Sequence, residues 1–201
     1  MTGLENLSYV GEDLYIFWND SLTSLAGLNN LDSTGGFFEV LGNDVLGSMS
    51  GCDNLTRIGG MMAINGNDNL TSIKGLGNLH FIGGDTEISA NGSLSSLDGL
   101  ENVSTINGNL KIYLNPLLEN CAGLEGIRSV GGYLWIRGNE SLTLLTGLDS
   151  LNSVGGQLWI QDNDTLGSLS GLESLEMIGG ELTISSNGAL TTLAGLCGVK
   201  S

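Results

Sequence analysis

Aromatic, cationic and amide side chains recur at related positions in the second half of the chain. Trp135 and Trp159 are 24 residues apart, and Arg137 and Gln161 share the same interval. Trp, Tyr and Arg are enriched in binding hot spots, because an aromatic ring offers a large apolar contact with a polar edge. We therefore predict a ligand-binding face for a protein or a carbohydrate. Strand-favouring aromatic residues on an ordinary sheet face are the alternative interpretation. The predicted face consists of Lys111, Tyr113, Tyr133, Trp135, Arg137, Trp159 and Gln161.

Small polar side chains, most of them hydroxyl-bearing, flank a leucine that recurs every 24 residues. If the repeats stack into a flat face, these hydroxyls resemble those of ice-binding proteins. Val45, Leu117 and Gly167 interrupt the array, and Ser is common at exposed turns in any case. Ice binding is therefore the second candidate function. The alternative ice face consists of Ser21, Thr23, Asn69, Thr71, Ser93, Ser95, Ser141, Thr143 and Thr191.

Half of the 22 acidic residues fall at two positions of the same repeat. Stacked repeats would align them in columns, and clustered carboxylate oxygens are ligands that Ca²⁺ favours. The chain has no EF-hand loop and no Gly-Gly-x-Gly-x-Asp repeat, however. We therefore interpret the columns as solvated stripes that resist aggregation, and we predict no metal site. The first column holds Glu5, Asp53, Glu101, Glu125, Asp149 and Glu173, and the second holds Asp20, Asp44, Asp68, Glu140 and Asp164.

Groups suited to catalysis are sparse. His80 is the only histidine, and no partner for a nucleophile–histidine pair is recognisable beside it. Glu39 and Glu87 occupy the same position two repeats apart, so stacking would separate them by about 9.6 Å, the far edge of the range used by inverting glycosidases. A carbohydrate-active enzyme is thus the third functional class, but chance is the preferred explanation of this pair. We expect neither enzymatic activity nor a cofactor.

All of these side chains are positioned by a 24-residue repeat that continues through the chain without insertion or deletion. Eight complete copies, called rungs below, begin at residues 3, 27, 51, 75, 99, 123, 147 and 171, and a partial ninth begins at residue 195. Gly occupies the first rung position, Asn the seventeenth and Leu the twentieth in all eight copies. Long internal repeats are the signature of solenoids, so residues 1–201 are expected to form a single solenoid domain.

Apolar residues fill seven rung positions in 54 of 56 cases and define the predicted core, with Thr34 and Thr86 as the exceptions. Two of these positions alternate with an outward residue, as in Leu134-Trp135-Ile136, which is the pattern of a short strand with one buried face. Stacked rungs would place such strands parallel and about 4.8 Å apart. The sequence therefore predicts an all-β fold, a parallel β-helix or solenoid of eight 24-residue rungs.

Two further features recur beside the predicted strands, a Gly-Gly pair before the strand and an Asn after it. A Gly-Gly pair precedes the strand in six rungs, where we expect the backbone to turn a corner with unusual dihedral angles. No Walker-type GxxxxGK[ST] motif or helix follows, so a phosphate-binding loop is not indicated. The Asn after each strand is expected to form a ladder of stacked amides. The ladder comprises Asn19, Asn43, Asn67, Asn91, Asn115, Asn139, Asn163 and Asn187.

The formal net charge is −16, from 22 acidic and six basic residues. Nucleic-acid binding is not expected, because it requires a basic face. The longest apolar run, residues 14–18, is too short to cross a bilayer, so we expect no membrane insertion. Cys52 and Cys121 stand at core positions and are interpreted as small buried hydrophobic residues.

The run Leu-x-x-Ile-Gly-Gly-x-Leu-x-Ile-x-x-Asn-x-x-Leu-Thr-x-Leu at residues 175–193 resembles the receptor L-domain repeat. That family includes the ligand-binding lobes of the insulin and epidermal growth factor receptors and related repeats of microbial surface proteins. The resemblance covers the whole chain and implies a right-handed, leucine-rich-repeat-like β-helix. It also implies an extracellular or cell-surface module that acts in recognition or adhesion without catalysis. Neither end carries a cap, so flanking domains or end-to-end contacts are expected.

Overall fold

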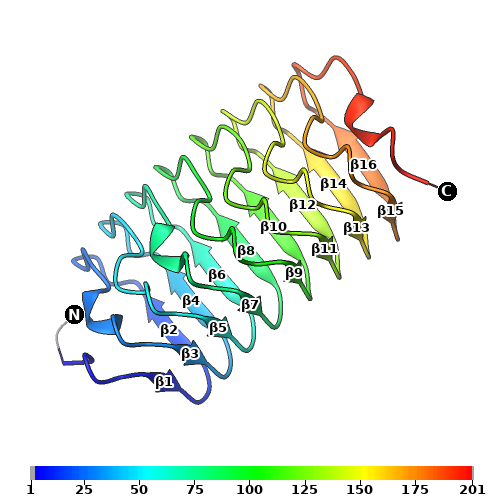
Figure 1. Ribbon diagram of the computed structural model, residues 1–201. Helices are drawn as coiled ribbons and strands as arrows, with labels where there is room; N and C mark the ends of the chain where they lie inside the picture. Colours follow the sequence, from blue (N-terminus) through cyan, green and yellow to red (C-terminus); the bar gives the residue numbers. More distant parts are fainter. Residues whose placement is uncertain (1–2, 201) are drawn as a thin grey trace.

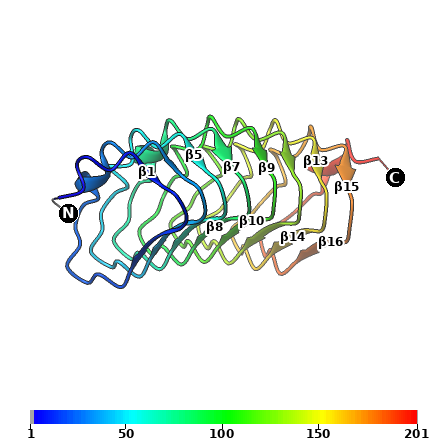
Figure 2. The same ribbon diagram turned by 90° about the horizontal axis from the view of Figure 1, so that it is seen from below.

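The computed structural model describes residues 3–200, and its chain winds into a rod of stacked rungs (Figure 1). The two chain termini lie at opposite ends of the rod, and the view from below shows the rungs side by side in sequence order (Figure 2). The chain forms two parallel sheets, and successive rungs pair at a spacing of 24 residues. The predicted all-β parallel solenoid is thus confirmed. Residues 1, 2 and 201 of the predicted domain lie outside the described part.

The strands of one sheet have two residues each, and those of the other have four. The short strands are β1 (Tyr9–Val10), β3 (Ser33–Thr34), β5 (Arg57–Ile58), β7 (Phe81–Ile82), β9 (Thr105–Ile106), β11 (Ser129–Val130), β13 (Ser153–Val154) and β15 (Met177–Ile178). The long strands are β2 (Leu14–Phe17), β4 (Phe38–Leu41), β6 (Met62–Asn65), β8 (Thr86–Ser89), β10 (Leu110–Tyr113), β12 (Leu134–Arg137), β14 (Leu158–Gln161) and β16 (Leu182–Ser185). Because neighbours pair in strict register, residues at one rung position form a column along the rod.

The seven predicted core columns point inward. Between the two end rungs, their apolar side chains are almost completely buried and form one continuous cluster. Within the end rungs, three core-column side chains are exposed because no further rung covers them on one side. They are Leu4, Leu182 and Leu193. The parallel pairing of identical columns therefore replaces the layered core of an ordinary domain with a stack of leucine and isoleucine rows.

Two threonines interrupt the apolar columns, and both are buried. The Thr34 hydroxyl donates a hydrogen bond to the Gly36 carbonyl oxygen at 3.2 Å. The Thr86 hydroxyl oxygen has no partner among the described residues, although its side chain is completely buried. A buried hydroxyl without a hydrogen bond costs about 1–3 kcal/mol of stability. Thr86 therefore lowers the stability of the core.

The asparagine ladder connects each rung with both of its neighbours. The Asn91 backbone N–H donates to Asn115 Oδ1 at 3.2 Å, in the following rung. The Asn91 side-chain amide donates to the Ile64 carbonyl oxygen at 2.8 Å, in the preceding rung. The same pattern runs from Asn43 to Asn163, all of which are buried. The predicted ladder therefore supplies hydrogen-bond partners to amide groups that a tight coil would otherwise bury unpaired.

The predicted role of the Gly-Gly pairs is wrong in its mechanism. No glycine of these pairs, which are Gly35-Gly36, Gly59-Gly60, Gly83-Gly84, Gly131-Gly132, Gly155-Gly156 and Gly179-Gly180, has a left-handed backbone. The constraint is close approach instead: a Cβ on Gly59 would overlap the Gly35 carbonyl oxygen, and a Cβ on Gly83 would overlap that of Gly59. The first glycine of each pair lets the backbones of successive rungs touch.

Left-handed backbone occurs at two other columns. At the sixteenth rung position, immediately after the long strand, all eight residues have φ between 52° and 64°. They are Trp18, Gly42, Gly66, Ala90, Leu114, Gly138, Asp162 and Ser186. This corner thus imposes one conformation on any side chain, including types for which it is strained.

The first glycine of a rung is left-handed only where an acidic residue follows two positions later. In the six rungs with that acid, the carboxylate accepts a hydrogen bond from the glycine N–H, as Glu101 does from Gly99 at 3.0 Å. Where the acid is absent, the glycine lies instead in a short 3₁₀ helix: η1 (Ala26–Leu28), η2 (Lys74–Leu76) or η3 (Ala194–Leu196). The exposed acidic column is solvated, as predicted, but it also selects the turn.

Removing the unpaired hydroxyl of Thr86 should stabilise the rod. We expect Thr86→Val to raise the free energy of unfolding by about 1 kcal/mol, since the variant keeps the shape of the side chain and buries no unpaired polar atom. Urea unfolding followed by circular dichroism measures the change. Thr34→Val is the matched control and should bring no gain, because the Thr34 hydroxyl is already bonded. Equal gains in both variants would contradict this explanation.

The turn carboxylates should make stability depend on pH. A hydrogen bond from the Gly171 N–H holds the pKa of Glu173 below its ordinary value, so the ionised form stabilises the fold. This contribution is present above the ordinary carboxyl pKa and is lost as the pH falls through the lowered value. Glu173→Ala should therefore lower stability at pH 7 by up to about 1 kcal/mol, as for an exposed cap, and by less in acid. Urea titrations at several pH values, with Glu119→Ala as control, would refute this if the two variants behaved alike.

Candidate binding face

The seven residues of the predicted binding face come together on the outer side of the long sheet. Six belong to β10, β12 and β14, and Tyr133 directly precedes β12. Ile112, Ile136 and Ile160 alternate with them and point into the core, so their neighbours in the strands point outward. Register pairing places Lys111 beside Trp135 and Arg137 beside Gln161.

Aromatic side chains on this face pack in two pairs across neighbouring rungs. Tyr113 stacks on Trp135 with ring centroids 5.0 Å apart and an interplanar angle of 26°. Tyr133 lies against Trp159 at 5.4 Å and 38°. All four rings are consequently half-buried. The pairing fixes the ring orientations before any ligand arrives, which reduces the entropy cost of binding.

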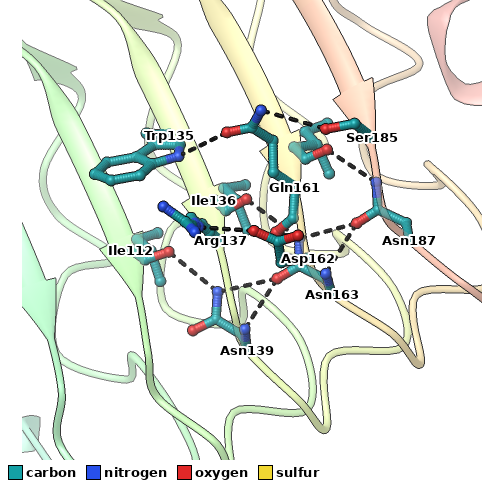
Figure 3. Close-up of polar contacts among 11 residues, drawn as sticks. Ile112, Trp135, Ile136, Arg137, Asn139, Gln161, Asp162, Asn163, Ser185 and Asn187 are labelled. Atoms are coloured by element: carbon teal, nitrogen blue, oxygen red, sulfur yellow. Dashed lines mark hydrogen bonds and ion pairs between the residues drawn. The ribbon is translucent and has the colours of Figure 1, made fainter.

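Polar contacts hold the side chains of β12 and β14 on this face (Figure 3). Trp135 Nε1 donates to Gln161 Oε1 at 3.3 Å, and Gln161 Nε2 donates to Ser185 Oγ at 3.3 Å. Arg137 Nε donates to Asp162 Oδ2 at 2.8 Å, in the next rung, and the Arg137 guanidinium lies 5.7 Å from the Trp135 ring centroid. Both aromatic and polar side chains are thus tied across three rungs.

The other cation of the face is neutralised by acidic neighbours. Lys111 Nζ lies 3.2 Å from Glu87 Oε2 and 3.8 Å from Asp85 Oδ2. Burial lowers the pKa of Lys111, but hydrogen bonds with Glu87 and Tyr133 outweigh that effect, so its pKa is raised overall and it stays charged. Glu87 also accepts hydrogen bonds from Tyr113 and from an asparagine amide, so little of its charge is available to a ligand.

A pocket of about 560 Å³ opens where this face meets the left-handed corner. The binding-face residues Tyr113, Trp135 and Arg137 belong to its lining. Sequence reasoning named Glu140 and Asp164 only as members of an acidic column, and it missed the remaining lining residues, which are Leu114, Gly138 and Asp162. A signal was present in the sixteenth column, where Leu114 and Asp162 flank Gly138, but its meaning depends on the corner geometry.

The residues of the alternative ice face do not form a regular sheet. Apart from an isolated bridge between Ser48 and Ser72, no strand pairing occurs on that side among residues 3–200. Several hydroxyls are used internally: those of Thr71 and Thr143 donate to carbonyl oxygens of the preceding rung at 3.1 Å and 3.3 Å. Thr191 does the same. Ice binding stays a prediction.

The candidate catalytic groups Glu39, Glu87 and His80 do not line this pocket. Burial, followed by the charges of Asp13 and Glu87, raises the pKa of Glu39. His80 is exposed, and its ring contacts only the Asn78 carbonyl oxygen within hydrogen-bonding distance in the described chain. No group of three or more His, Cys, Asp or Glu side chains within residues 3–200 could hold a metal ion.

The two core cysteines behave as the sequence indicates. Cys52 and Cys121 are buried and unpaired, and burial raises the pKa of both thiols to about 12. Neither is ionised at neutral pH, so neither is an activated nucleophile. A third cysteine, Cys197, is exposed. No helix in the described part of the chain is long and apolar enough to cross a membrane.

Comparison of the chain with protein-family models, with curated proteins and with solved structures finds no match.

The network around Glu87 should stabilise the rod, whereas the ionised Glu39 should not. Glu87→Gln removes the charge that Lys111 faces and turns one donor toward its ammonium group, so unfolding should become easier by about 1–2 kcal/mol. The raised pKa of Glu39 means that its charged form is disfavoured in the fold, so Glu39→Gln should leave stability unchanged or raise it. Urea midpoints at pH 7 measure both. Equal destabilisation by the two substitutions would contradict the assignment.

Proposed function

We propose that the protein is a non-enzymatic recognition module that binds a carbohydrate on the outward face of β10, β12 and β14. The observation that carries this proposal is the coincidence, on the same three rungs, of two oriented aromatic pairs and a pocket. Aromatic rings bury the apolar faces of sugar rings, while neighbouring amide and charged groups bond to hydroxyls. Gln161 and Asp162 stand beside the rings in this arrangement.

The dimensions of the face favour a carbohydrate over a protein partner. A stable protein interface buries about 800 Å² on each partner and centres on exposed anchor residues. Here the rings are half-buried against one another, and the recess beside them has a volume of about 560 Å³, the size of a small-ligand site. The two aromatic pairs succeed each other along the rod at the rung spacing of about 4.8 Å, comparable with the length of one pyranose unit in an extended chain.

Our proposal includes an extracellular or cell-surface location and a role in adhesion or ligand capture. The resemblance of the repeat to receptor L-domains supports it, and so does the charge of −16, which keeps a protein soluble and disfavours binding to nucleic acids. Flanking domains or end-to-end contacts between rods would bring several such faces together and raise their avidity.

The two tryptophans should carry most of the binding energy. Against a panel of immobilised oligosaccharides, the double variant Trp135→Ala, Trp159→Ala should bind at least about tenfold more weakly than the unmodified protein, because two stacking surfaces are lost. The rings lie outside the core, so the rod should still fold, which circular dichroism checks. Trp18→Ala is the control, since Trp18 is 74% exposed in the first rung, remote from the face. Unchanged binding by the double variant, or no binding by the unmodified protein, would refute the proposal.

A further inference from the structure

Gly138, which has no side chain, lines the pocket beside Trp135 at the left-handed corner. Leu114 and Asp162 occupy the sixteenth position in the rungs before and after Gly138 and share its backbone conformation, with φ of 56° and 55° against 62° for the glycine. The Leu114 side chain is 53% exposed and leans over Gly138, where a Cβ would lie 3.0 Å from Leu114 Cδ2, and Asp162 bonds to Arg137 from the other neighbouring rung. The recess is therefore a local feature of three rungs, built on a backbone path that the whole rod repeats.

The charges around the pocket are unbalanced. Arg137 and Asp162 neutralise each other through their 2.8 Å ion pair. Glu140 and Asp164 also line the pocket, and neither carboxylate has an ion-pair or hydrogen-bond partner within residues 3–200. Both stand at the eighteenth rung position, so their backbones are about 4.8 Å apart. Like charges directly opposite each other on parallel neighbours are destabilising, and a cation between them would remove that cost.

Aromatic side chains also line the pocket. Tyr113 and Trp135 line the pocket as a stacked pair, and Trp135 cannot rotate freely because Gln161 accepts from its indole N–H. Aromatic rings attract cations through their negative faces, and carboxylates add charge-assisted hydrogen bonds. A primary ammonium group satisfies both kinds of group at once, whereas an anion would meet two free carboxylates on a protein of charge −16.

We propose that this pocket selects a carbohydrate bearing a protonated amino group, an amino sugar with a free amine. This inference rests on the proposed function and narrows its ligand class. Glu140 and Asp164 would bind the ammonium group, while the Tyr113–Trp135 pair would pack against the sugar ring. A bare metal ion is a poorer fit, because no cluster of three ligating side chains occurs in the described chain.

The chain contains an internal comparison that separates the pocket from acidity alone. Asp44 and Asp68 stack at the same eighteenth position in earlier rungs. Gly66 occupies the corner two residues before Asp68 with φ of 64°, as Gly138 does two residues before Glu140 with φ of 62°. No aromatic pair lies beside Gly66, and it does not line the pocket. Substitutions at Asp44, Asp68 or Gly66 therefore change the charge or the corner shape as much as substitutions at Glu140, Asp164 or Gly138 do, but they leave the pocket unaltered.

Calorimetric titration with three β-1,4-linked tetrasaccharides, of glucosamine, N-acetylglucosamine and glucose, tests the inference at constant ionic strength. These probes share one backbone and differ in the charge at one substituent. We expect the glucosamine tetramer to bind at least about tenfold more tightly than the two neutral tetramers, the size of one charge-assisted contact in a partly exposed site. Glu140→Gln with Asp164→Asn should abolish this preference, and Asp44→Asn with Asp68→Asn should retain it.

A second pair of variants tests the pocket itself. Gly138→Asn should fill the recess and weaken binding of the glucosamine tetramer at least about tenfold, since Asn tolerates the left-handed conformation that Asp162 adopts nearby. Gly66→Asn should have no effect. Circular dichroism and urea unfolding verify that both variants fold.

The outcomes distinguish this inference from the proposed function. Tight, Trp135-dependent binding of neutral tetramers would overturn the amine preference and leave carbohydrate recognition standing. An equal loss from the Asp44 and Asp68 variant would overturn it as non-specific charge attraction. Tighter binding of a tetralysine peptide, sensitive to Gly138→Asn, would assign the pocket to a protein partner and overturn it too. Absence of binding by all probes would overturn both proposals.

Discussion

Each ladder asparagine between the end rungs bonds to both neighbouring rungs at once, and this requirement constrains the rest of the rod. Its backbone N–H reaches the amide oxygen of the next rung, while its side-chain amide reaches a strand carbonyl of the rung before, with separations of 24 and 27 residues along the chain. An inserted or deleted residue would break both bonds and leave buried polar groups unpaired. The same spacing keeps the leucine rows aligned and brings successive glycine backbones into contact. With the interior so restricted, the outward columns are the positions that are free to differ.

Most of the fold follows from the sequence because it depends on periodicity alone. The repeat indicates the register, the alternation in the strand indicates which residues point inward, and the invariant asparagine indicates the ladder. The mistaken explanation of the Gly-Gly pairs has a physical cause: glycine permits both unusual dihedral angles and close contact, and one sequence cannot separate the two. The turn at the start of each rung shows the same limit. Glu101 reads as one member of a charged stripe, and only coordinates reveal that it accepts a hydrogen bond from Gly99.

The binding face could be predicted only in part. Register alone brings Trp135, Trp159 and Arg137 together, since columns are fixed by the repeat. Side-chain partners are a different matter, because they depend on rotamers that the period does not encode. Lys111 is paired with Glu87, and the aromatic rings cover one another, so the face is less exposed and less cationic than composition suggests. The pocket could not be predicted for a further reason: its lining includes Gly138, and the lack of a side chain there has a meaning only once the corner geometry is known.

The left-handed corner after each long strand has an implication for how such a surface changes over time. Tryptophan, glycine, alanine, leucine, aspartate and serine all occupy it with nearly the same backbone angle, so the rod has already accepted very different side chains there. The side chain at this corner varies while the backbone around it stays the same, as the hypervariable loops of an antibody domain vary on a constant β-sandwich. One substitution at this corner opens or closes a recess in a single rung while its neighbours keep their shape. Diversification of ligand preference along the rod would therefore need neither new folds nor altered chain length.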